Sequence, residues 1–279
     1  MSVLHRLYEK VFFWFHDTGL VKQLIVEQQY FTFLQTARSQ DPKRLLSAGY
    51  TVFSQADEDG ILAEILRRIG MTSQTAVEFG LQHGLESNTL LFAADGWKTW
   101  WFEGDEAYTK ELAEKFHSGI CPQLQIEQAF ITSKNINQIF RAAKVPKEID
   151  VLCIDIDSCD YWVWKGLTVT KLCVVIIEYN AEWGPNVAWT VPDDPDFRWQ
   201  GDSHYGASLK ALEKLGASKG YTLVGCSYSG VNAFFVRNDL VKKRFSVPAT
   251  SENHWEPPRE KFIFKPGKMR AIRPVVKVK

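Results

Sequence analysis

The sequence has no excess of either charge. Its 279 residues include 33 lysines and arginines and 33 aspartates and glutamates, so the formal net charge is zero. A neutral molecule has no overall field that would attract nucleic acid or anionic lipid. The composition therefore gives no reason to expect a nucleic-acid partner.

Paired cysteine motifs are also missing. The chain contains five cysteines but no CxxC pair, and at least two of them lie inside apolar runs. We therefore expect small buried hydrophobic side chains in a reduced, cytoplasmic protein, and no disulfide framework. The five are Cys121, Cys153, Cys159, Cys173 and Cys226.

Long apolar runs are absent as well. No stretch approaches the roughly 20 residues that cross a bilayer, so we expect no transmembrane segment. Near the N-terminus, Arg6, Glu9 and Lys10 interrupt the apolar pattern, which argues against a signal peptide.

Residues 3–36 carry apolar side chains at three- and four-residue steps, which predicts helices. The aromatic run 12–15 suits either an interfacial membrane anchor or packing against the main domain or a second subunit. The charges nearby are balanced, whereas membrane-surface helices are usually basic, so packing is the favoured interpretation. A weak membrane-surface association and a homo-oligomer formed through these helices both stay open.

The most informative feature present is a set of four short apolar runs that each end in acidic residues. They occupy residues 76–80, 100–105, 151–157 and 174–180. Such continuous runs predict parallel strands buried on both faces. Ligands of open α/β sheets bind beyond the carboxyl ends of the strands, so these acids indicate a site.

Helical patterns alternate with these runs, which predicts an α/β fold. The last two predicted strands, 221–226 and 232–237, are separated by a hairpin-sized gap and should be antiparallel neighbours. We expect a mostly parallel sheet with a reversed strand at or near its edge. The predicted units are an N-terminal helical extension (1–46), the main domain (47–245) and a basic tail (246–279). From residue 257 onward the tail has eight basic residues and one acidic residue. It could steer an anionic substrate or a phosphate-bearing partner. A tail that is simply solvated or laid along the domain is more common, and the solvated tail is favoured.

A cofactor crevice is indicated by the loop after the first strand and by the acid that ends the second. Glu103 lies 19 residues after Gly84, the spacing at which an acid accepts hydrogen bonds from the ribose of an adenosine cofactor. The patterns GxGxxG and GxxxxGK[ST] are both absent, so no phosphate cradle is evident. We expect an adenosine cofactor without phosphate. The alternative is a tight turn followed by an unrelated glutamate.

Four segments resemble the class I S-adenosylmethionine-dependent methyltransferases, and in particular the FkbM-like branch and related bacterial proteins found with polysaccharide genes. The segments are 54–62, 77–80, 86–89 and 155–161, and the resemblance covers about residues 50–240. It implies a Rossmann-like methyltransferase sheet in which Glu78 and Gly80 line the methionine part of the cofactor and Glu103 binds its ribose. Gln82 departs from the family pattern, because it replaces the middle glycine of GxGxG. The cofactor-binding residues that we predict are Gln55, Glu78, Gly80, Gly84, Ser87, Asn88, Glu103 and Asp155. For the Gln55 segment, a helix N-cap is the alternative.

Methyl transfer to an alcohol needs alignment of the reacting atoms and removal of a proton. Asp155, Glu178 and His204 are the predicted catalytic residues. Oxygen ligands at two neighbouring strand ends also suit Mg²⁺ or Mn²⁺, and the predicted ligands are Asp155, Asp157, Glu178 and Asn180. Helix caps and ion pairs are the alternative roles for these acids, and His204 in a loop could be incidental.

The long loop 181–203 contains Trp183, Trp189 and Trp199, whose aromatic faces suit sugar rings. It is the predicted acceptor lid. The sequence thus favours an O-methyltransferase that acts on a hydroxyl of a sugar or polysaccharide, with S-adenosylmethionine as cofactor. A methyltransferase of a small natural product or of nitrogen is one alternative. A methyltransferase-like binding module without activity is another.

Overall fold

The computed structural model describes residues 25, 28–116, 121–259 and 276–277. Most of the predicted N-terminal helical region and most of the predicted basic tail lie outside the described residues. Within them, residues 28–34 are helical, in agreement with the periodicity of that segment.

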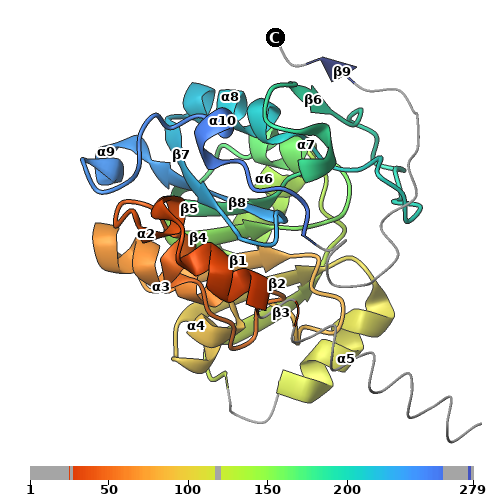
Figure 1. Ribbon diagram of the computed structural model, residues 1–279. Helices are drawn as coiled ribbons and strands as arrows, with labels where there is room; N and C mark the ends of the chain where they lie inside the picture. Colours follow the sequence, from red (N-terminus) through yellow and green to blue (C-terminus); the bar gives the residue numbers. More distant parts are fainter. Residues whose placement is uncertain (1–24, 26–27, 117–120, 260–275, 278–279) are drawn as a thin grey trace, which may run out of the picture.

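A mixed sheet of seven strands forms the centre of the molecule (Figure 1). Its order is β3-β2-β1-β4-β5-β8-β7, and every neighbouring pair up to β5 is parallel. β8 is antiparallel to both β5 and β7, so the single reversed strand lies one position in from the edge. The predicted fold class is confirmed. The strands are β1 (Thr75–Phe79), β2 (Lys98–Glu103), β3 (Leu124–Gln128), β4 (Glu148–Ile154), β5 (Lys171–Glu178), β7 (Tyr221–Cys226) and β8 (Asn232–Arg237).

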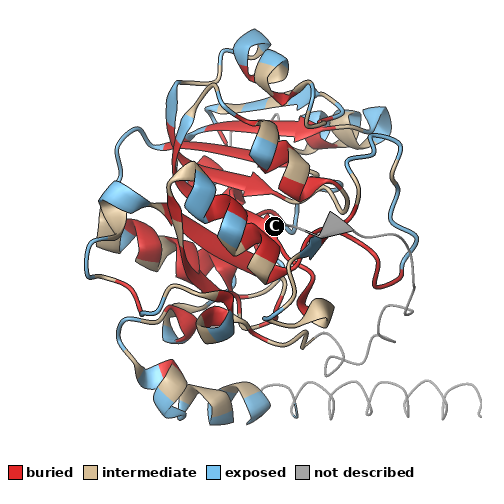
Figure 2. Ribbon diagram, turned by 90° about the horizontal axis from the view of Figure 1, so that it is seen from above, coloured by how far each residue is buried: buried red, intermediate tan, exposed pale blue. Residues whose placement is uncertain are grey.

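Helices cover both faces of this sheet. One layer consists of α6 (Ile136–Ala142), α7 (Asp160–Gly166) and α8 (Leu209–Lys219), whose apolar residues share a core with one face of the strands. The other layer consists of α3 (Glu58–Ile69), α4 (Leu90–Ala94) and α5 (Glu106–Phe116). Figure 2 shows the buried strands between these two layers. The remaining elements are short: α2 (Ala37–Gln40), η1 (Leu46–Ala48), η2 (Ala181–Trp183), β6 (Trp189–Thr190), α9 (Asn238–Val241), α10 (Ser251–His254) and β9 (Val276–Lys277).

Successive strand residues face the two layers in alternation. In β4, Val151 and Cys153 pack in the core under α3, whereas Leu152 and Ile154 pack in the core under α6 and α7. Both faces are therefore apolar, which explains why the strands are continuous apolar runs in the sequence. All five cysteines are buried and free, as the composition predicts.

The start of α4 differs from the prediction. The sequence pattern favours a helix over residues 87–95, but α4 begins at Leu90. The backbone N–H groups of Asn88 and Thr89 are bound instead by the Glu78 carboxylate, at 2.9 and 3.0 Å. The Glu78 side chain thus holds these two residues outside the helix, and α4 starts later than the pattern predicts.

Residues 255–259 lie against the β7–β8 hairpin. Glu256 is buried and forms ion pairs with Arg38 at 2.8 Å and with Arg259 at 2.9 Å. The Arg259 guanidinium stacks over Tyr228 at 3.8 Å from the ring centroid. This first part of the tail is therefore packed along the domain as far as residue 259.

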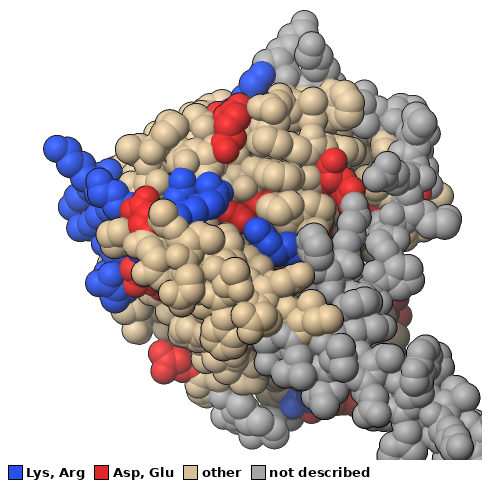
Figure 3. Space-filling view, in the orientation of Figure 1, with Lys and Arg blue, Asp and Glu red and all other residues tan. Residues whose placement is uncertain are grey.

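Charge is unevenly distributed although the chain is neutral. Lysine and arginine side chains gather on the flank of the molecule where α3 and α9 lie (Figure 3), and Lys43, Arg67, Lys242 and Lys243 are exposed.

No helix in the described part of the chain is both long enough and apolar enough to cross a bilayer.

Candidate active site

The register of the parallel strands aligns the predicted site residues in a row. Phe79 of β1 is paired with Phe102 of β2 and with Ile154 of β4, and Ile154 is paired with Ile177 of β5. The next residue along each of these four strands is therefore in one row across the carboxyl edge. That row reads Glu103, Gly80, Asp155 and Glu178.

Glu103 is buried at the end of β2, and two backbone N–H groups hold its carboxylate. One oxygen accepts a hydrogen bond from Gln82 N–H and the other accepts one from Asp105 N–H, both at 2.9 Å. A carboxylate offers about four acceptor positions, two on each oxygen. Within the described residues, one position on each oxygen remains for a further hydrogen-bond donor.

Gly80 is required by the close approach of β1 and β4. Its φ is +75°, and a Cβ placed there would lie 1.7 Å from the Asp155 backbone oxygen. Any side chain would therefore force the two strand ends apart. Gln82 follows with a φ of +47°, a conformation that is uncommon for residues other than glycine. In that conformation the Gln82 backbone N–H reaches the Glu103 carboxylate.

Gly84 closes the loop against α5. Its N–H donates to the Leu81 carbonyl at 2.7 Å, and a Cβ at Gly84 would lie 2.4 Å from Leu112 Cδ2. The small residue thus lets the loop after β1 pack on the helix that follows β2.

Glu78 is one residue before the row and is bound to the start of α4. Its carboxylate accepts hydrogen bonds from Ser87 Oγ at 2.5 Å and Thr89 Oγ1 at 2.6 Å, besides two backbone N–H groups. Complete burial raises its pKa, although these hydrogen bonds act in the opposite direction. The Asn88 amide donates to Cys153 Sγ at 3.2 Å. Glu78, Ser87 and Asn88 thus fix the geometry of the connection between β1 and α4.

The segment around Gln55 forms a turn that is held by acids of α3. Asp59 Oδ2 accepts hydrogen bonds from three consecutive backbone N–H groups, those of residues 52–54, at 2.7 to 2.9 Å. Ser54 Oγ in turn accepts from Asp59 N–H at 3.2 Å, so part of the alternative helix-cap role is present. The Gln55 side chain itself is exposed. Glu58 is linked to the sheet, because it accepts from Asn232 Nδ2 at 3.0 Å and Asn232 is paired with Glu178.

Three predicted metal ligands lie together. One carboxylate oxygen from each of Asp155, Asp157 and Glu178 can be chosen so that all lie within 4.8 Å of one another. Asp157 has a φ of +54°, in the turn between β4 and α7. Asp160 is not part of the group: it accepts from Ile156 N–H and Ser158 N–H, and burial raises its pKa to about 6. Asp160, the first residue of α7, therefore holds the turn before that helix, whose N-cap position is Cys159.

Asn180 and His204 lie in the loop that follows β5. The Asn180 amide donates to the backbone oxygens of Ser203 and Tyr205 at 2.9 and 3.1 Å, and its oxygen accepts from Glu182 N–H at 3.1 Å. Asn180 therefore ties the two ends of the predicted lid together. His204 is buried within this folded segment, and its backbone N–H donates to Asp202 Oδ1. Both residues stay predicted site residues.

The predicted lid reaches across two neighbouring connections. Trp162 of α7 donates to the Val191 oxygen at 2.8 Å, and Ser133, before α6, donates to Asp193 at 2.9 Å. Arg198 stacks over Phe130 at 4.7 Å. These contacts carry the loop from the end of β5 toward the end of β3. Sequence reasoning missed Phe130, Ser133 and Arg198, because contacts between the loop after β5 and the connection after β3 leave no local pattern in the sequence.

Asp57 is another residue that the sequence did not single out. It is buried beside Glu58, and its carboxylate accepts from Tyr228 N–H at 2.9 Å. Burial, with repulsion from Glu58, raises the pKa of Asp57 to about 7. It joins α3 to the β7–β8 hairpin, and its only signals in the sequence were the charge-rich run 57–59 and its place within the segment 54–62.

The sheet order, with β8 between β5 and β7, is that of the Rossmann-like α/β sheet predicted from the sequence. No protein-family model matches the chain, and a search of curated proteins found no match either. The FkbM-like branch therefore stays a prediction of the sequence.

Several solved structures have a similar arrangement. One is the N-terminal domain of EvdMO1 with SAH bound, with a TM-score of 0.42 and 11% identity over 77% of this chain and 94% of that one. An O-methyltransferase from Bacillus cereus in complex with SAH has a TM-score of 0.42 and 15% identity, over 77% and 89%. A SAM-dependent methyltransferase from Aquifex aeolicus has a TM-score of 0.39 and 12% identity, over 62% and 87%. Likenesses this distant assign no residue roles, which must come from the chain itself.

Proposed function

We propose that this protein is a cytoplasmic S-adenosylmethionine-dependent O-methyltransferase whose acceptor is a hydroxyl of a sugar or polysaccharide. The observation that carries the proposal is the row of Glu103, Gly80, Asp155 and Glu178 at the carboxyl edge of four adjacent strands. A ligand-binding crevice of an open α/β sheet belongs at this edge. The five buried free cysteines fit a reducing compartment.

The residues around Glu103 fit the adenosine part of the cofactor. Its carboxylate is pre-positioned by Gln82 and Asp105 and keeps acceptor capacity for two hydroxyls. Strands in a sheet are about 4.8 Å apart, so Glu103 and Asp155 are separated by roughly 10 Å, with the side-chain-free Gly80 between them. An extended cofactor can therefore bind ribose at β2 and present its sulfonium methyl near β4.

The donor set near Asp155 fits a hard divalent cation. Asp155, Asp157 and Glu178 supply carboxylate oxygens within 4.8 Å of one another, the chemistry that Mg²⁺ or Mn²⁺ prefers. Such an ion, when bound, lowers the pKa of a coordinated hydroxyl. Without an ion, the same carboxylates would orient the acceptor or a base such as His204.

The exposed tryptophans of the loop 181–203 favour an acceptor, such as a sugar ring, that can pack against aromatic side chains. Trp189 and Trp199 are each 37% exposed, and Trp183 lies 6.0 Å from Trp189 in an edge-to-face contact. Amphipathic aromatic surfaces of this kind pack against sugar rings. A small natural product or a nitrogen nucleophile is the alternative acceptor, and an inactive binding module is the alternative to catalysis.

Formation of SAH during incubation with S-adenosylmethionine tests the proposal. We expect SAH to accumulate only when a hydroxylated acceptor is added from a panel of monosaccharides, oligosaccharides and small phenols. The same panel offered as amines tests the nitrogen alternative. Tight cofactor binding without SAH formation from any acceptor would favour the inactive module.

A further inference from the structure

A cavity lies at the opposite edge of the sheet from the candidate active site. Its volume is about 580 Å³, within the range of small-molecule pockets. Glu148, Lys171 and Tyr221, the first residues of β4, β5 and β7, line it together with Arg237, the last residue of the reversed β8. β5 has eight residues, so roughly 25 Å of strand separates this cavity from Glu178.

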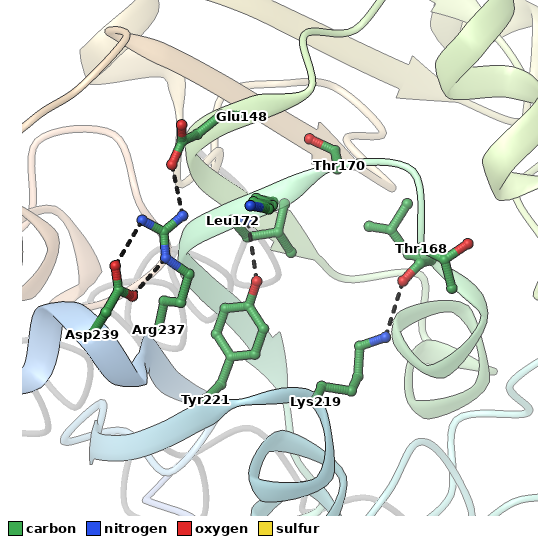
Figure 4. A pocket seen from close by; sticks show the side chains of 10 residues that line it. Glu148, Thr168, Thr170, Leu172, Lys219, Tyr221, Arg237 and Asp239 are labelled. Atoms are coloured by element: carbon green, nitrogen blue, oxygen red, sulfur yellow. Dashed lines mark hydrogen bonds and ion pairs between the residues drawn. The ribbon is translucent and has the colours of Figure 1, made fainter.

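On one wall of the cavity the carboxylates are already paired with an arginine. Arg237 donates to Glu148 at 2.7 Å and, through two nitrogens, to Asp239 at 2.7 and 3.2 Å (Figure 4). Both carboxylates that line the cavity are engaged by this single guanidinium. A cationic ligand would have to compete with Arg237 for either of them.

The other wall offers donors. The Tyr221 hydroxyl accepts a hydrogen bond from Leu172 N–H at 3.1 Å, and its own hydrogen has no acceptor in the described part of the chain. The half-buried Lys219 ammonium donates to the backbone oxygens of Leu167 and Lys165 at 2.9 and 3.3 Å, which leaves one of its three protons available. Lys171 adds a second ammonium at the exposed rim.

We propose that this cavity binds a small metabolite that carries a phosphate or carboxylate group on a short carbon body. The anion would lie between Lys219, Lys171 and the Tyr221 hydroxyl, and the body would contact the buried side chains of Leu167 and Leu172. Hydrogen bonds to a charged partner are worth more than neutral ones, so an anion gains most from these donors. Burial lowers the pKa of Lys219, and a bound anion would raise it again.

Calorimetric titration with three probes that share a three-carbon body tests this site. Glycerol 3-phosphate carries a phosphate, glycerate carries a carboxylate, and glycerol carries no charge. We expect at least one anion to bind with a dissociation constant below about 1 mM at low ionic strength, and glycerol not to bind. The phosphate and carboxylate arms identify which anion the cavity prefers, and added salt should weaken binding.

Variants assign the binding to this cavity. Lys219→Gln should weaken binding about tenfold, as expected for the loss of one charge-assisted hydrogen bond. Lys171→Gln should weaken it severalfold, and it changes an exposed residue, so the test holds even if Lys219→Gln fails to fold. Lys98→Gln is the matched control, because Lys98 is the exposed first residue of β2 and does not line the cavity. Absence of binding by both anions, or equal affinity in wild type, Lys171→Gln and Lys98→Gln, would overturn the proposal.

Discussion

Asp155 and Glu178 are the side chains on which the proposed chemistry depends most. Asp155→Asn and Glu178→Gln preserve shape but remove a charge from the group of three carboxylates. We expect each change to lower kcat by about 100-fold or more, because loss of acid–base or metal assistance has effects of that size. Steady-state kinetics, with S-adenosylmethionine affinity measured separately, provides the check.

The exposed Asp95→Asn, at the C-terminal end of α4 and outside the acceptor loop, serves as the control for these two variants. If a metal takes part, EDTA should inhibit the wild type and Mg²⁺ or Mn²⁺ should restore activity. Full activity in EDTA would exclude the metal. The loss of activity would then be expected in the His204→Gln variant. Full activity of both charge-removing variants would refute the site.

The free energy of unfolding should depend on pH through His254. It is buried in α10 beside Arg38 and Arg44, and burial, with repulsion from these arginines, lowers its pKa to about 4. Between the unfolded value near 6.5 and this folded value, only the unfolded chain binds the proton. Stability from the neutral imidazole is therefore present above pH 6.5 and is lost as the pH falls toward 4.

The His254→Gln variant isolates this contribution. The difference in free energy of unfolding between wild type and variant should shift by roughly 3 kcal/mol from pH 6.5 to 4, at about 1.4 kcal/mol per pKa unit. Urea denaturation at several pH values measures it. A difference that stays constant with pH would contradict the assignment.

Side-chain partners at the site were only partly predictable. Glu103 and Asp155 could be placed from the sequence because each directly ends a buried strand, and strand ends meet at one edge. The hydrogen bonds of Glu78 to Ser87 and Thr89 could not, because they depend on how the chain turns between β1 and α4. Asn180 was selected for its oxygen, yet its amide binds the backbone of the lid, a contact between residues more than 20 positions apart.

At the level of elements, the loop after β5 is the part that would govern the acceptor. It is fixed at its base by Asn180 and at its far side by contacts with α7 and with the connection after β3. We expect the double variant Trp189→Ala and Trp199→Ala to raise the acceptor KM severalfold, because it removes exposed aromatic surface that packs on the acceptor. The affinity for S-adenosylmethionine should change less than twofold by the same contact argument.

A buried tryptophan such as Trp97 cannot provide the control for that variant, because its removal would disturb the core. Phe31→Ala is suitable, since Phe31 is 60% exposed and lies in the helical residues 28–34. A loss of cofactor affinity in the tryptophan variant, with the acceptor KM unchanged, would show that the loop serves the cofactor instead.

Element boundaries followed from the sequence where local signals agree. α8 begins after Ser208, whose hydroxyl accepts from Ala211 N–H at 3.2 Å, and the helix ends at Gly220 with a left-handed φ of +84°. α4 was predicted too long because its first N–H groups bind a glutamate from another element. Local patterns carry no information about such a partner.

For the whole molecule, the alternation of buried strands and helices was sufficient to predict the fold class. The hairpin gap also indicated that the last two strands are antiparallel. Which of them lies beside β5 could not be inferred, because either strand is apolar enough to be buried; the structure inserts β8 there. The cavity at the opposite edge could not be predicted either, since its lining comes from four separate stretches of the chain, at residues 148, 167–172, 219–221 and 237–239.

The central claim is that the carboxyl edge of the sheet binds S-adenosylmethionine through Glu103, and equilibrium titration of wild type and Glu103→Ala tests it most directly. Loss of two charge-assisted hydrogen bonds to the ribose should weaken both S-adenosylmethionine and SAH by at least about tenfold. Glu127→Ala, at an exposed position on the neighbouring strand β3, should bind like the wild type. Equal cofactor affinity in the folded Glu103→Ala protein, or no binding by the wild type, would contradict the account.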